Sequence, residues 1–130
     1  RIVADAKLLK TLGIGVAAIC SNDATIKPAD SFPNMQVFAR THGFGFPYLH
    51  DEDQSVARAY DAVCTPDFFG YNAEGGLQYR GRLDSNAGRD PQPGATRDLA
   101  VAMREVAETG SGPSAQIASM GCSIKWKTAA

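Results

Sequence analysis

The sequence predicts an α/β fold in a single domain that spans residues 1–130. Segments with apolar residues at three- and four-residue spacings, typical of amphipathic helices, alternate with short apolar runs typical of strands. The run at residues 14–19 is almost continuously apolar, as in a parallel strand covered on both faces. Two aromatic-rich runs, 68–71 and 77–82, flank a turn of small and polar residues and predict a β-hairpin.

The first half of the chain predicts helix, strand and helix. Residues 2–12 carry their apolar side chains on one helix face, and Gly13 follows as a stop signal. The strand at 14–19 comes next. Two prolines and several small polar residues predict a surface loop over 24–33, and a second helix is expected over 34–41.

The second half adds a short strand, a short helix, the hairpin and a last helix. Residues 46–49 are rich in aromatic residues and predict a short strand. The acidic residues 51–53 predict the start of a short helix, because negative charges interact favourably with the N-terminal end of the helix dipole. Residues 84–93 are polar and rich in Gly, Asn and Pro, and predict a loop. An amphipathic helix over 95–108 follows, with Gly110 beyond its end. Its expected core contacts are Leu99, Val101, Ala102 and Val106.

Composition excludes several classes of function. Thirteen basic and fourteen acidic residues give a net charge of -1 without a basic cluster, so we expect no nucleic-acid partner and no membrane contact. Three widely spaced cysteines argue against a secreted disulfide framework and favour a reducing, cytoplasmic location. His42 and His50 have no ligand partners at metal-binding spacing, so neither a metal nor another cofactor is expected.

The stretch Cys64-Thr65-Pro66-Asp67 lies between a predicted helix and the first hairpin strand. Proline can neither continue a helix nor donate to a central ladder, so this junction requires a special turn. The Thr65–Pro66 bond is a candidate for the cis isomer. A trans proline that starts the strand is the other interpretation.

Six sequence blocks run in order over nearly the whole chain and together resemble one protein family. They are Ile19-Cys20-Ser21-Asn22-Asp23, Phe46-Pro47-Tyr48-Leu49, Val56-Ala57-Arg58-Ala59-Tyr60, Cys64-Thr65-Pro66-Asp67-Phe68-Phe69, Tyr79-Arg80-Gly81-Arg82-Leu83-Asp84 and Gly121-Cys122-Ser123-Ile124-Lys125-Trp126-Lys127. The resemblance is to peroxiredoxin-like proteins of the thioredoxin family, the redoxins of the alkyl-hydroperoxide-reductase and thiol-specific-antioxidant (AhpC/TSA) group.

The resemblance implies a thioredoxin-like fold with three α/β/α layers, ending in a β-hairpin and a helix. It also implies a reactive cysteine, alone or in Cys-x-x-Cys, at the N-terminus of the first long helix, where the thiol pKa is lowered. These 130 residues contain no Cys-x-x-Cys, and residues 1–12 resemble the far end of that helix. We therefore expect an N-terminal strand and the Cys-x-x-Cys segment to be missing. By itself such a chain is expected to be inactive, and to be unstable or to form a homo-oligomer.

The function implied is that of an antioxidant redoxin, a thiol-disulfide oxidoreductase or thiol peroxidase. Its partners would be a protein disulfide or peroxide substrate and an external thiol reductant. Thr65 and Pro66 would dock the substrate, because their backbone edge can pair with an extended peptide. Cys64 has either a functional role near the site or only a packing role, and Cys122 is a candidate resolving thiol. Both are candidate auxiliary thiols, not the primary nucleophile. A non-catalytic thioredoxin-fold binding or interaction module is the alternative.

The remaining conspicuous residues have structural interpretations. Cys20 is expected to be buried and to have a packing role. Residues 51–53 are expected to form the solvent-exposed start of a helix. Trp126 is expected to anchor the tail to the domain. The expected ion pairs join Arg80 and Arg82 to Asp67 or Asp84.

Overall fold

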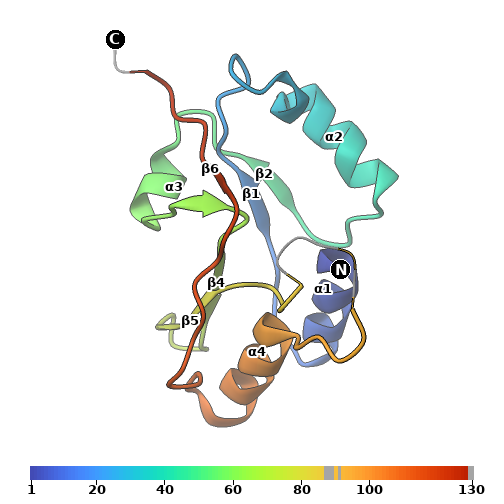
Figure 1. The fold of residues 1–130 in the computed structure, drawn as a ribbon, viewed down its shortest axis with the longest axis vertical. Coiled ribbons are helices and arrows are strands. Elements are labelled where there is room, and N and C mark those ends of the chain that lie inside the picture. The colour runs from blue at the N-terminus through green and yellow to red at the C-terminus, as the bar shows by residue number, and fades with distance from the viewer. Residues whose placement is uncertain (87–89, 91, 129–130) are drawn as a thin grey trace.

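A computed structural model describes residues 1–86, 90 and 92–128. Helices and strands are interspersed along it, with β3, β4 and β5 in succession, and confirm the predicted α/β class (Figure 1). The predicted loop at 84–93 falls partly outside the described residues. The elements are α1 (Ile2–Thr11), β1 (Ala18–Cys20), the 3-10 turn η1 (Pro28–Asp30), α2 (Phe32–Thr41), β2 (Tyr48–His50), α3 (Ser55–Ala59), β3 (Cys64–Thr65), β4 (Phe68–Tyr71), β5 (Leu77–Gly81), α4 (Asp98–Thr109) and β6 (Cys122–Ser123).

The described strands pair in three separate two-stranded sheets. β1 and β2 are parallel, with Ile19 opposite Leu49, and β4 and β5 form the predicted antiparallel hairpin. The third sheet joins β3 to β6, two strands that the sequence did not predict. In Figure 1 the chain after α4 runs past the hairpin and then along β3, so the C-terminal tail crosses the whole molecule.

The expectation for the first strand was wrong in its length and its burial. Strand β1 has three residues, and the Ile19 side chain is 41% exposed. Ile14 and Val16 pack against the hydrophobic core without belonging to a strand. Within the described residues β1 pairs with β2 only, and Ile19 does not belong to the hydrophobic core. A parallel strand is covered on both faces only where other elements pack on each face of its sheet.

The hydrophobic core lies where α1, β5 and α4 meet. Leu9 and Tyr79 contact one face of α4, and the Tyr79 hydroxyl donates to the Arg82 carbonyl oxygen at 2.6 Å. Val101 was predicted to join this core and is instead 66% exposed, because it lies off the helix face that its neighbours share. The core residues that α4 supplies are Leu99, Ala102, Met103 and Val106.

The first helix ends where its sequence indicates, and the second begins earlier than predicted. Gly13 has a φ of +79°, and the N–H groups of Gly13 and Ile14 donate to the carbonyls of Lys10 and Leu9. This pattern closes the last turn of α1 and requires a left-handed residue at position 13. α2 begins two residues before its predicted start, with Ser31 as its N-cap. In the part of the chain that the structure describes, no helix is long and apolar enough to span a membrane.

Candidate functional site

The Thr65–Pro66 turn follows α3 directly. Asp61 takes a left-handed φ of +58° and ends α3, with the Ala62 N–H donating to the Ala57 carbonyl at 3.0 Å. The chain then forms β3, and the Thr65–Pro66 peptide bond is cis, one of the two conformations that the sequence left open. Because proline has no N–H, β3 ends here and β4 begins two residues later.

The C-terminal tail occupies the strand edge of β3. Cys64 lies opposite Ser123 and Thr65 opposite Cys122 in an antiparallel ladder, and the Thr65 hydroxyl donates to the Cys122 carbonyl at 3.3 Å. The preceding Gly121 approaches so closely that a Cβ there would lie 2.1 Å from the Thr65 carbonyl oxygen. Only glycine fits this contact without displacing the backbone.

Two buried amide side chains hold the tail beyond β6. Gln54, 1% exposed, donates to the carbonyls of Ser21 and Lys125 at 2.7 and 2.9 Å and accepts from the Lys127 N–H at 2.9 Å. Asn22 accepts from the Lys125 N–H at 2.8 Å. We call residues 121–127 the strap, and Asn22 with Gln54 the amide clamp.

The sequence analysis did not single out the amide clamp. Asn22 belongs to a block that carries the family resemblance, but its partner Lys125 lies 103 residues away. Buried amides that bind backbone groups so far along the chain leave no periodic signal. The left-handed backbone of Gln54, with a φ of +64°, is rare for a residue other than glycine, so the sequence gives no sign of it.

The two auxiliary thiols do not come together. In an antiparallel ladder directly opposite residues share a face and successive residues alternate, so Cys122 shares a face with Thr65, and Cys64 the other face with Ser123. Cys122 is exposed, whereas Cys64 is half-buried and its thiol lies 3.7 Å from the Ser119 carbonyl oxygen. A disulfide between them would need this ladder to rearrange.

Neither Cys64 nor Cys20 lies in a setting that activates a thiol. Burial raises the pKa of Cys64, the nearby Asp67 carboxylate raises it further, and Arg80 only partly opposes them. Cys20 is buried at the end of β1, and this burial raises its pKa as well. All three cysteines are free thiols. The packing interpretation of Cys20 agrees with its burial.

The arginines of the hairpin strand make structural ion pairs. Arg80 lies 3.4 Å from the Asp67 carboxylate, as expected, and its guanidinium covers the Phe69 ring at 4.9 Å. Arg82 pairs with Asp98 at 2.7 Å, a partner that the sequence did not predict. Asp84 is instead 2.8 Å from Arg1.

Trp126 anchors the strap, as predicted. Its ring lies under the Arg58 guanidinium of α3 at 4.9 Å, and the neighbouring Ile124 is 5% exposed. A cation over an indole face adds to the apolar contact.

The acidic residues before α3 include one that is buried, which corrects the expectation of a solvated helix start. Asp51 is 6% exposed and accepts hydrogen bonds from the Ser21 hydroxyl at 2.6 Å and the Ala57 N–H at 2.9 Å. Its charge is balanced by the N–H groups at the start of α3. Across the described residues, no group of three or more His, Cys, Asp and Glu side chains could hold a metal ion.

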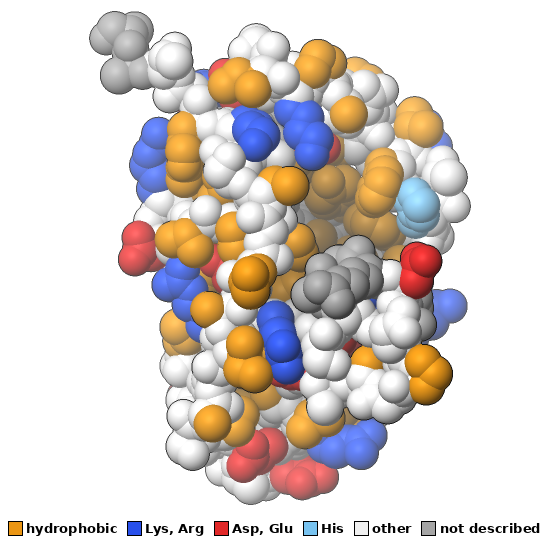
Figure 2. Space-filling model, viewed as in Figure 1, with side chains coloured by type: hydrophobic (Ala, Val, Ile, Leu, Met, Phe, Trp, Pro, Cys, Tyr) orange, Lys and Arg blue, Asp and Glu red, His pale blue; other side chains and the backbone are white. Residues whose placement is uncertain are grey.

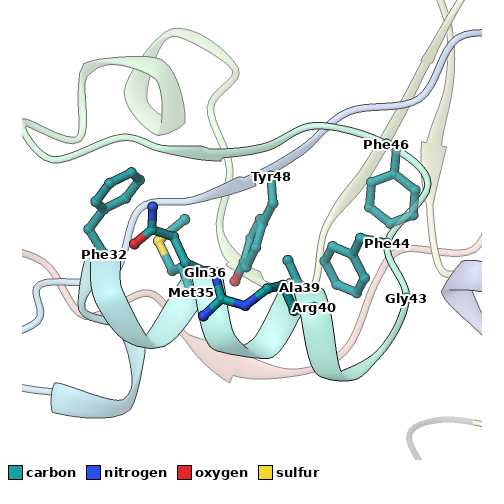
Figure 3. Close-up of a pocket in the computed structure, with 9 residues that line it drawn as sticks. All are labelled: Phe32, Met35, Gln36, Ala39, Arg40, Gly43, Phe44, Phe46 and Tyr48. Carbon is teal, nitrogen blue, oxygen red and sulfur yellow. The ribbon is translucent and has the colours of Figure 1, made fainter.

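An aromatic recess lies between α2 and β2, separate from the Thr65 turn (Figure 3). It has a volume of about 440 Å³, and the rings of Phe44 and Phe46 stack at 4.6 Å on its wall. Figure 2 shows hydrophobic side chains around a hollow on the viewed face, between the positions of β6 and α2. The recess is lined by Phe32, Met35, Gln36, Ala39, Arg40, Gly43, Phe44, Phe46 and Tyr48, and so by none of the predicted site residues.

Comparisons with known proteins agree with the resemblance. A hypothetical protein from Sinorhizobium meliloti has a similar solved structure, with a TM-score of 0.86, 36% identity, and coverage of 98% of this chain and 73% of that one. An uncharacterized conserved protein from Geobacillus kaustophilus gives a TM-score of 0.83, 38% identity, and coverage of 99% and 71%. No curated protein gives a significant match.

The family model for AhpC/TSA matches residues 1–81, which include β1, the amide clamp and the Thr65–Pro66 turn. This family implies the thioredoxin-like fold that the sequence blocks predicted. The chain belongs to the AhpC/TSA family.

Proposed function

We propose that the protein is a thiol-dependent redox protein that reduces a hydroperoxide or exchanges thiols with a protein disulfide. The AhpC/TSA match over residues 1–81 carries this proposal, because the matched region contains the Thr65–Pro66 turn. With a hydroperoxide, two thiols of an external reductant would give up two electrons and two protons. The products would be a disulfide, an alcohol and water.

The primary attacking thiol, in this proposal, lies outside these 130 residues. The thiolate is the reactive form of cysteine, and the raised pKa values of Cys20 and Cys64 keep both thiols protonated at neutral pH. The S. meliloti structure has residues beyond the part that this chain covers, since the coverage of that chain is 73%. Thr65 and Pro66 would line the site, and Cys64 and Cys122 would be auxiliary thiols.

Two turnover assays on the full natural protein test the proposal. With dithiothreitol as reductant, we expect consumption of tert-butyl hydroperoxide, or reduction of insulin followed by turbidity, above the rate without protein. Catalysis of either reaction supports the redox assignment. No turnover in both assays, with a correctly folded protein, rejects it.

A binding module is the second candidate function. What favours it is that burial raises the pKa values of Cys20 and of the half-buried Cys64, which suits a fold that holds a peptide without attacking it. This alternative is supported if the full natural protein catalyses neither reaction but binds an extended peptide. A reducing compartment such as the cytoplasm suits either function, because the three cysteines would remain thiols.

A further inference from the structure

We propose that the strap is an internal ligand of an extended-peptide site, which the Thr65 strand edge and the amide clamp form together. In this state the site is closed to an extended segment of another protein, and release of the strap opens it. The inference rests on the proposed function, because that function assigns substrate docking to the Thr65 edge.

The strap binds as an extended peptide binds a strand edge. Its first residues pair antiparallel with β3 through the register that joins Thr65 to Cys122. Backbone pairing of this kind supplies affinity, and alternate side chains supply specificity. A second peptide cannot pair with the same backbone groups of Thr65 while Cys122 occupies them.

The far end of the strap lies in a receptor made of side chains. The clamp makes three hydrogen bonds to strap backbone groups, from Gln54 to the Lys125 carbonyl and from the Lys125 and Lys127 N–H groups to the clamp oxygens. The Asp23 N–H adds a fourth, to the Lys125 carbonyl at 2.8 Å. Buried amides that satisfy backbone groups recognise a chain in extended form rather than a particular charge.

A buried side chain fixes the register of the strap between these two ends. Ile124 is 5% exposed, whereas Cys122 and Ser123 are exposed. The site therefore combines a strand edge, one apolar position and an amide clamp. A protein segment that replaces the strap would have to be extended and carry an aliphatic residue two positions after the one opposite Thr65.

Opening the strap at Gly121 tests the proposal. In Gly121→Val the new side chain collides with the Thr65 carbonyl, since the Cβ alone would lie 2.1 Å from it. Gly112→Val is the matched control, because its Cβ would lie 2.1 Å from the Gln78 carbonyl, on the same tail but away from β3. The probe is a fluorescein-labelled synthetic peptide of residues 121–127 with serine in place of cysteine, and its binding is followed by fluorescence anisotropy.

We expect the peptide to bind Gly121→Val about tenfold or more tightly than the wild type and Gly112→Val. Adding Gln54→Met to Gly121→Val should abolish this gain, because the clamp is then lost. Equal affinity for the wild type and Gly121→Val overturns the proposal, as does a gain that Gln54→Met leaves intact. If Gly121→Val does not fold, faster hydrogen exchange of residues 122–127 in Gln54→Met supports the strap, and unchanged exchange overturns it.

A second readout separates this inference from the proposed function. The rate of insulin reduction relative to hydroperoxide consumption should rise about tenfold in Gly121→Val and stay constant in Gly112→Val. If Gly121→Val binds the peptide but its ratio of insulin reduction to hydroperoxide consumption is unchanged, the strap does not control access of a protein substrate to the site. If no variant turns over either substrate but the peptide binds as expected, the redox assignment fails and the internal ligand stands.

Discussion

Replacing Gln54 by methionine should loosen the strap and lower the stability of the whole domain. Methionine nearly preserves the volume of this 1% exposed side chain, so the change isolates the amide's hydrogen bonds from cavity formation. Three bonds are lost, to Ser21, Lys125 and Lys127, at 2.7 to 2.9 Å. At a net contribution of about 1 kcal/mol each, the free energy of unfolding should fall by about 3 kcal/mol.

For a domain of this size, that loss corresponds to a fall in melting temperature of roughly 10 °C. Differential scanning calorimetry measures it, and hydrogen exchange followed by mass spectrometry shows whether residues 122–127 lose protection first. Gln36→Met is the control, since Gln36 is exposed on α2 and should change the melting temperature little. A Gln54→Met melting temperature equal to that of the wild type would refute the reasoning.

Two further predictions concern titratable groups. Burial disfavours the charged Asp84, but hydrogen bonds from Asn86 and the Arg1 ion pair outweigh it and lower its pKa below 3.8. Relative to Asp84→Asn, the wild type should therefore be more stable above that pH and lose the advantage as pH falls through the folded-state pKa, which urea unfolding at several pH values measures. Iodoacetamide at neutral pH should modify exposed Cys122 faster than Cys64, whose pKa is raised mainly by burial. Peptide mass spectrometry gives both rates, and faster modification of Cys64 than of Cys122 would contradict the raised pKa of Cys64.

Local patterns in the sequence predicted the elements that local interactions form. The hairpin of β4 and β5 follows from two aromatic runs around a turn, and the end of α1 follows from Gly13. The burial of Ile19 was predicted wrongly, because an apolar run indicates a strand but not which elements pack against each of its faces. The three- and four-residue spacing of apolar residues also predicted Val101 at the core face of the last helix. Its neighbours Ala102 and Met103 lie on that face instead.

The site was predictable in part. Proline chemistry located the turn at Pro66, and the family model matches the region that contains this turn, residues 1–81, but not the tail. The contact between turn and tail was not predictable, because β3 and β6 have two residues each and lie far apart in the chain. Strands this short carry no alternating pattern, and the amide clamp acts on backbone groups, which every residue shares.

The central claim is that redox chemistry takes place at the Thr65–Pro66 turn, and hydroperoxide turnover by the full natural protein tests it most directly. Thr65→Trp would fill the turn with a large ring, and Thr11→Trp, at the exposed end of α1, is the control. With the fold of each variant verified by circular dichroism, kcat/KM should fall about tenfold or more in Thr65→Trp and stay near the wild-type value in Thr11→Trp. Equal kcat/KM values in the two variants would contradict the placement of the site.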